Sequence, residues 1–156
     1  MGYVGDFSLE ARRAHDGPPY QVRAAGKLVQ VRILRMASGA DAERLNADTL
    51  RAMGPLSGPT RIVCTDCRTA APLAPDAVDA WSRGMREVNA RIERGAILID
   101  PANAMFNLQA ERAVRCAGKP ERHLFTDLDR VIRWLDEALG EPERAELRRF
   151  LSSIAS

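Results

Sequence analysis

The sequence has no long apolar run, few aromatic residues and almost no net charge, and each of these shortages excludes a class of protein. No stretch approaches the roughly 18 apolar residues of a membrane-spanning helix, and the first residues lack the apolar segment of a secretory signal. Aromatic residues make up 5% of the chain and provide no platform for stacking bases. The 23 basic and 21 acidic residues are interleaved, which predicts no strong attraction to nucleic acid. We therefore expect a cytoplasmic protein without nucleic-acid partners or stable membrane insertion.

Cysteine is also scarce. Cys64, Cys67 and Cys116 are an odd number in a chain without a secretory signal, so we expect no disulfide framework. Cys64 and Cys67 form a C-x-x-C, but Cys64 falls in a predicted strand and not at a helix N-terminus, where a redox cysteine belongs. Residues three apart on a strand face opposite sides, so two buried thiols are favoured over a redox protein. Cys116, His15 and His123 provide no second close pair of ligands, so we expect no metal and no other cofactor.

Sequence motifs of the common enzymes are absent. The chain contains no G-x-G-x-x-G, no G-x-x-x-x-G-K-[ST] and no G-x-S-x-G, which removes the usual signs of nucleotide binding and of hydrolase chemistry. Neither histidine has a nucleophile and a carboxylate at the spacing of a recognisable triad motif. We therefore expect a protein that is not an enzyme.

The pattern of apolar residues predicts a leader over residues 1–19 and one domain over 20–156. Tyr20 to Ala24 and Val29 to Ile33 alternate with polar neighbours around a turn at Gly26, which is typical of a β-hairpin. The expected elements that follow are a helix over 41–53, a strand over 61–66, a helix from Pro75 to Ile92, a strand over 96–99, a helix over 106–117, a strand over 123–125, a helix capped by Thr126 and a C-terminal helix over 142–154.

This alternation of strands and helices predicts an α/β fold. Right-handed crossovers between successive strands make the sheet mixed and largely parallel, with about five strands, about five helices and the first strand antiparallel. Ala96 to Ile99 are apolar on both faces, as in a central strand that is covered on both sides.

Polar side chains gather where the predicted parallel strands end. The carboxyl ends of such strands form the usual binding crevice of an open α/β sheet. The candidate partner- or ligand-binding residues are Ser38, Asp41, Asp66, Arg68, Thr69, Asp76, Asp100 and Asn103. The same residue types also cap helices and form turns, so both interpretations stay open. Arg68 is the best anchor for a partner, because a guanidinium binds carboxylate or phosphate with two donors; alternatively it pairs with Asp66 or Asp76.

Several stretches resemble the SpoIIAA-like branch of the STAS fold, a group of small domains typified by anti-sigma-factor antagonists. The stretches that carry the resemblance are Gly26-x-Leu28-Val29-x-Val31, the run from Arg61 to Arg68, Arg94-x-Ala96-Ile97-Leu98, and the run from Phe125 to Trp134-Leu135. The resemblance covers about residues 20–140 and places Trp134 in the core. It implies a STAS-like domain that works in protein recognition.

The resemblance also implies a regulatory role in bacteria, with the loop from Cys67 to Asp76 and the following helix facing a protein partner. In the best-known members a serine at the start of that helix is phosphorylated, but residues 69–76 contain no serine. The alternative is a small-ligand carrier of the same fold, for a lipid or a nucleotide. A homodimer is left open.

Overall fold

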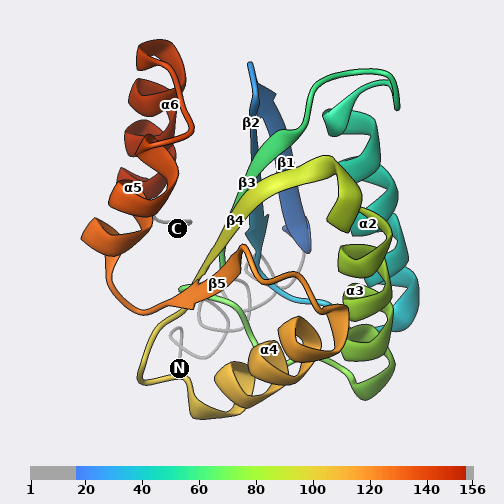
Figure 1. Cartoon of the computed structure of the whole chain (residues 1–156). Coiled ribbons are helices and arrows are strands. Elements are labelled where there is room, and N and C mark those ends of the chain that lie inside the picture. The colour runs from blue at the N-terminus through green and yellow to red at the C-terminus, as the bar shows by residue number, and fades with distance from the viewer. Residues whose placement is uncertain (1–16, 154–156) are drawn as a thin grey trace, which may run out of the picture.

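The computed structural model describes residues 17–153 and contains one five-stranded sheet in the order β1-β2-β3-β4-β5 (Figure 1). The strands are β1 (Tyr20–Ala25), β2 (Leu28–Ile33), β3 (Arg61–Asp66), β4 (Ile92–Leu98) and β5 (Arg122–Phe125). The hairpin of β1 and β2 is antiparallel and turns at Gly26, whose φ of +60° favours glycine. The other strand pairs are parallel. The predicted mixed, largely parallel sheet is confirmed.

Helices cover the sheet on both faces. They are α2 (Gly39–Met53), α3 (Pro75–Glu87), α4 (Ala104–Ala117), α5 (Leu128–Asp136) and α6 (Glu141–Ser152), with a short 3-10 turn η1 (Asn89–Arg91). Because α2, α3 and α4 each join neighbouring parallel strands with the same hand, they lie together on one face, and α5 and α6 cover the other (Figure 1). None of the helices in residues 17–153 is long and apolar enough to cross a membrane.

The alternation of side chains along each strand divides the core in two. The α2–α4 side receives Val29, Val31 and Ile33 of β2, and the α5–α6 side receives Leu28, Gln30 and Arg32 of the same strand. All six residues are buried. Gln30 and Arg32 are buried because α6 covers them. The alternation of residues within β2 does not predict this burial.

Three predicted boundaries were wrong: the end of the helix from Pro75, the start of the strand over 96–99 and the N-cap of α5. The helix from Pro75 ends at Glu87, and Ile92 begins β4 after the 3-10 turn. Ile92 is buried in the α2–α4 core, and an apolar residue suits a buried position in a helix as well as in a strand, so its apolar character did not distinguish a helix end from a strand start. The N-cap of α5 is Asp127, whose carboxylate accepts the Asp129 N–H at 2.9 Å, and not Thr126. Asp caps a helix as well as Thr does, so the boundary moved by one residue.

The remaining helices and the short last strand lie within two residues of their predicted ranges. The predicted leader falls mainly on residues 1–16, which are outside the described residues, as is Ile154 at the end of the predicted C-terminal helix. The sheet begins at Tyr20, as predicted.

Trp134 packs at the border of the α5–α6 core and not at its centre. The indole is half-buried, its Nε1 donates to the Gly95 carbonyl at 3.2 Å, and the Arg94 guanidinium lies 4.3 Å from the ring centre. The ring of His123 contacts it edge-on at 4.9 Å. The Trp134 side chain therefore fastens α5 to β4 and β5 through one hydrogen bond and two ring contacts.

Trp134→Ala is expected to lower the free energy of unfolding by about 2 kcal/mol, less than for a fully buried ring. Trp134→Phe keeps the ring packing and removes the Nε1 donor, so its loss is expected to be about half as large. Urea unfolding followed by circular dichroism measures both. Equal stability of wild type and Trp134→Ala would contradict the docking of α5 through this side chain.

Candidate functional site

The loops after β2, β3 and β4 meet at the carboxyl edge of the sheet, where the sequence placed a candidate site. The Ala71 N–H donates to the Leu34 carbonyl at 2.9 Å, and the Cys67 N–H donates to the Leu98 carbonyl at 2.8 Å. These backbone bonds join each loop to its neighbour. The predicted site residues are thus brought to one edge, but most of them bond to the protein itself.

Ser38, Asp41 and Asp76 stabilise the start of α2. The Ser38 hydroxyl accepts the Asp41 N–H at 3.3 Å, and the Asp41 carboxylate accepts the Ala37 N–H at 3.0 Å. The Asp76 carboxylate, from the first turn of α3, accepts the Gly39 N–H at 2.9 Å. All three therefore satisfy N–H groups around one helix N-terminus, which is the capping role that the sequence left open.

Asp100 and Asn103 form the turn between β4 and α4. The Asp100 carboxylate accepts the Ala102 N–H at 2.9 Å, and the Asn103 amide donates to the Ala70 carbonyl at 2.7 Å. Asn103 thereby ties this turn to the loop after β3. The exposed side chain of Thr69 lies in that loop, directly before Ala70.

Asp66 lies at the centre of a buried charge cluster that also contains Arg32 and Arg68. The parallel register places Arg32 opposite Asp66, and the Arg32 Nε donates to the Asp66 carboxylate at 3.1 Å. Arg68 donates to the same carboxylate through Nε at 3.0 Å and Nη2 at 3.1 Å. Asp66 is 4% exposed, so this bidentate pair forms largely out of water.

Both arginines of the cluster also hold the end of α6. Arg32 donates to the carbonyls of Phe150 and Ser153, each at 2.7 Å, and Arg68 donates to the Leu151 carbonyl at 2.7 Å. These carbonyls belong to the last turn of the helix and to its C-cap Ser153, where the dipole is negative and hydrogen-bond donors are lacking. The structure shows Arg68 paired with Asp66, which was one of the two alternatives for this residue. The Arg68 guanidinium is therefore already bonded within the protein.

Burial by itself raises the pKa of the Asp66 carboxyl. The hydrogen bonds from Arg68 and Arg32 outweigh burial and hold the pKa below its usual value. Asp66 is therefore an ionised structural residue, because a carboxylate with a lowered pKa is a poor general base at neutral pH.

An exposed apolar surface adjoins the same loops. Met105 and Leu108 of α4 are 59% and 65% exposed. Gln109 fastens α4 to the loop after β3, because its amide accepts from the Leu73 N–H and donates to the Leu73 carbonyl, both at 2.8 Å. Ala71 and Pro72 of that loop are exposed as well. We name Ala71, Pro72, Met105 and Leu108 the edge surface.

A groove between α3 and α4 shares α4 with the edge surface and is mainly basic. Arg83, Arg86 and Arg112 line it, and Asp79 is the acidic residue in its lining. Asp79 and Arg112 are 3.9 Å apart with mostly exposed side chains, which is a weak pair. Met105, Gln109 and Arg112 follow at spacings of four and three, so they lie along one side of α4. We refer to the edge surface and the basic groove together as the strip, because exposed residues of α4 contribute to both.

Cys64 and Cys67 lie on opposite faces of the sheet, as the strand geometry predicted. Cys64 belongs to the α5–α6 core and Cys67 to the α2–α4 core, and both are 0% exposed. Burial, followed by the nearby Asp66 carboxylate, raises the pKa of both thiols. Cys116 on α4 is exposed. No group of three candidate metal ligands occurs within residues 17–153.

The sequence did not identify Arg32, Met105 or Leu108 as candidates. Arg32 occupies a polar position in a strand of alternating pattern, and such a position usually faces solvent. In the structure α6 covers it. The apolar positions of the predicted helix over 106–117 form its buried stripe, and Met105 and Leu108 are not among them. Their absence from that stripe is the signal that marks them as exposed.

Comparison with known proteins identifies the fold. No protein-family model and no curated protein matches the chain. The chain is similar to the crystal structure of an uncharacterized protein of the DUF3478 family, with a SpoIIAA-like fold, from Shewanella loihica PV-4. The TM-score is 0.55 at 16% sequence identity, over 74% of this chain and 91% of that chain. The chain has a SpoIIAA-like fold. The resemblance drawn from its strand motifs is confirmed for the fold, and the SpoIIAA-like domain found here is a single α/β unit.

Arg68→Ala is expected to lower the free energy of unfolding at pH 7 by about 2 to 3 kcal/mol, since Asp66 and the Leu151 carbonyl each lose a buried donor. The lowered pKa of Asp66 means that its contribution is complete above about pH 4, the unfolded value, and is lost as the pH falls. The difference between variant and wild type should therefore shrink in acid. Urea unfolding at pH 7 and at about pH 3 measures it.

Arg51→Ala is the matched control, because Arg51 pairs with Asp48 at 3.2 Å but has a side chain that is 77% exposed. Its effect is expected to stay below about 0.5 kcal/mol at both pH values. If Arg68→Ala were as stable as this control, the structural role of Arg68 would be wrong.

Native protein is expected to react with Ellman's reagent at one thiol, Cys116, and at all three cysteines after denaturation. Burial and the raised pKa values keep Cys64 and Cys67 unreactive in the fold. The Cys116→Ser variant should lose the native reaction. Rapid labelling of two thiols in the native Cys116→Ser variant would instead support the redox interpretation.

Proposed function

We propose that this SpoIIAA-like domain is a non-enzymatic protein-interaction module and that it binds its partner through the edge surface and the adjoining basic groove. The observation that carries the proposal is the exposure of Met105 and Leu108 beside the loop after β3. Apolar side chains clustered on a surface and rimmed by polar residues mark interaction sites. This location agrees with the loop that the resemblance assigned to partner recognition.

The charges beside the edge surface indicate the chemistry of the partner. Three arginines and one aspartate line the groove, so the lining carries a net positive charge. An acidic segment with apolar side chains on one side complements this strip, with its apolar side on Met105 and Leu108 and its carboxylates on Arg83 and Arg112. We therefore propose an acidic, amphipathic segment of another protein as the occupant.

The predicted polar residues contribute to this function by rigidity and not by direct contact. Asn103 ties the loop after β3 to the start of α4, and the Asp76 carboxylate ties the start of α3 to the start of α2. Gln109, which was not among the predicted residues, also holds this loop against α4. A surface that is already ordered loses less conformational entropy when it binds. A regulatory role in a bacterial cytoplasm is the setting that we propose for the module.

Leu108→Glu is expected to abolish capture of the partner, because it places a charge in the apolar half of the strip and repels an acidic segment. Leu56→Glu is the matched control: Leu56 is 85% exposed and precedes β3, at the opposite end of the sheet. Tagged wild type and both variants are incubated with nuclease-treated lysate of the source organism, and the captured proteins are quantified by mass spectrometry.

The supporting result is a protein captured by wild type and Leu56→Glu and reduced at least about tenfold with Leu108→Glu, with equal melting temperatures for the three chains. Arg112→Glu should reduce the same protein. Equal capture by Leu108→Glu and Leu56→Glu would contradict the proposal. A wild-type dimer that Leu108→Glu separates, without loss of another protein, would assign the surface to self-association.

A further inference from the structure

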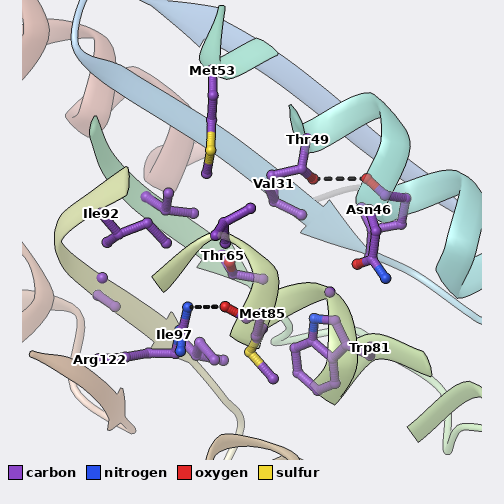
Figure 2. Close-up of a pocket in the computed structure, with 16 residues that line it drawn as sticks. Val31, Asn46, Thr49, Met53, Thr65, Trp81, Met85, Ile92, Ile97 and Arg122 are labelled. Atoms are coloured by element: carbon purple, nitrogen blue, oxygen red, sulfur yellow. Dashed lines mark hydrogen bonds between the residues drawn. The ribbon is translucent and has the colours of Figure 1, made fainter. Parts of the chain in front are cut away.

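Two buried arginines on opposite faces of the sheet border hollows of different size. Arg122 of β5 is 6% exposed and donates to the Asn89 side-chain oxygen at 2.8 Å and to the Met85 carbonyl at 3.1 Å, beside a cavity of about 40 Å³ (Figure 2). That cavity holds a few waters, since each needs about 10 to 15 Å³. Arg32 of β2 is also 6% exposed, but it lines a pocket of about 300 Å³. The pocket beside Arg32 therefore has room for a ligand, which the cavity beside Arg122 lacks.

The pocket beside Arg32 lies between the β1–β2 hairpin and the end of α6. The antiparallel register places Gln21 opposite Arg32 and, two residues further on, Arg23 opposite Gln30. These four side chains share the face of the sheet that α6 covers. From α6, the lining contains Glu146, Arg149, Phe150 and Ser153. The side chains of Arg23 and Arg149 are 70% and 67% exposed, so the pocket is open to solvent beside them.

Arg32 uses only part of its guanidinium to hold α6. Its Nε donates to Asp66, and its Nη2 donates to the carbonyls of Phe150 and Ser153. Its Nη1 carries two more N–H groups, and no acceptor within residues 17–153 bonds to either of them. The Nη1 atom is not sealed from solvent, since Asn107 Oδ1 is the buried polar atom without a partner in this part of the chain. A buried guanidinium thus presents two unused donors to the pocket.

The pocket and the buried charge cluster behind it carry a surplus of positive charge. Among the lining residues, Arg23 and Arg149 share one carboxylate, Glu146, which is 3.9 Å from Arg23. In the cluster, the Asp66 carboxylate balances Arg32, and among the described residues no second carboxylate pairs with Arg68. Four arginines therefore face two carboxylates, which leaves two positive charges. Carbonyls at the end of α6 solvate the cluster but supply no full negative charge.

The lining offers little to the apolar part of a ligand. Val22 and Phe150 are its apolar residues. The Arg32 guanidinium lies over the Phe150 ring, 4.5 Å from its centre, and so occupies one face of the ring. A nucleobase needs an aromatic or apolar surface to stack on, and an acyl chain needs apolar walls on several sides. The pocket therefore selects a compact, strongly charged group.

We propose that this pocket binds the phosphoryl group of a phosphate monoester, with the phosphoryl oxygens on Arg32 Nη1, Arg23 and Arg149. A phosphate monoester carries nearly two negative charges at neutral pH, which match the surplus of the pocket, and a carboxylate carries one. Its three terminal oxygens match three guanidinium groups. The group belongs either to a small metabolite or to a phosphorylated residue of another protein. The site is on the α5–α6 face and does not depend on the strip of α3 and α4.

Isothermal titration at pH 7.5 with ethyl phosphate tests the charge and the shape together. We expect one site per chain with a dissociation constant below about 1 mM, and a rise in melting temperature because the ligand binds the folded state. Ethyl sulfate has the same shape and one charge, so it should bind at least about tenfold more weakly. No saturable binding of ethyl phosphate up to about 10 mM would overturn the proposal, and so would equal binding of the two esters.

A phosphopeptide distinguishes the two sources of the phosphoryl group. The probe is an alanine pentapeptide, blocked at both ends, with phosphoserine at its centre, and the same peptide with unmodified serine should not bind. If the phosphopeptide binds at least about tenfold more tightly than ethyl phosphate, the site belongs to a phosphorylated protein segment. If it binds equally or more weakly, the site belongs to a small phosphate monoester. The Leu108→Glu variant should bind both probes as wild type does, which separates this site from the strip.

Arg149→Gln removes one of the exposed guanidinium groups and is expected to weaken ethyl phosphate at least about tenfold. Arg51→Gln is the matched control, because Arg51 is 77% exposed and lies on α2. Both variants should melt at the temperature of wild type. An equal loss of binding in the two variants would assign the affinity to the overall charge of the protein and overturn the proposal.

Glu146→Gln makes the opposite change, because it removes the carboxylate of the lining. We expect it to tighten ethyl phosphate at least about threefold. Glu43→Gln, at an exposed position of α2, makes the same change of charge away from the pocket and should leave the affinity as it is. Wild-type affinity in Glu146→Gln would place the anion elsewhere and would also overturn the proposal.

Discussion

The pairing of Asp66 with Arg32 and Arg68 is the interaction on which the docking of α6 against the sheet depends. The carboxylate lies between Arg32 and Arg68, and the two guanidinium groups in turn bind carbonyls in the last turn of α6. Removal of this carboxylate would leave two buried cations side by side, which is far less favourable than the paired arrangement. Since α6 provides Leu147 and Leu151 to the core on that face, its docking decides whether the apolar side chains there are covered.

The two faces of the sheet treat buried charge differently. On the α5–α6 face, the charge of Arg32 is balanced inside the protein, and the cluster serves to join a helix to the sheet. On the α2–α4 face, Arg122 is surrounded by neutral oxygens and borders a cavity. A sheet with helices on both sides thus allows one face to be closed by ion pairs while the other holds a buried charge that only neutral oxygens solvate.

The course of the strands and helices was predictable because it depends on local periodicity and on the handedness of crossovers. The hairpin and the antiparallel first strand of an otherwise parallel sheet follow from such signals. The end of α3 did not, because an apolar residue such as Ile92 fits the pattern of a buried helix end as well as that of a buried strand start.

The candidate site was predictable in place but not in detail. Parallel strands bring Asp66, Asp100 and the start of α2 to one edge whatever their side chains do. The Arg68 guanidinium bonds to the Leu151 carbonyl, 83 residues further along the chain, and no local sequence pattern predicts that contact. The same applies to Arg122, whose partners Met85 and Asn89 come from a different crossover.

The dependence of the sheet on α6 also has a consequence for the order of events during synthesis. Residues of β2 and β3 leave the ribosome early, whereas the carbonyls that Arg32 and Arg68 bind belong to residues 150–153. The α2–α4 layer has all of its partners before then, but Leu28, Ile62 and Cys64 stay without their covering helices. The nascent chain therefore carries a half-covered sheet until translation has passed α6, and this apolar face is the one that a chaperone would recognise.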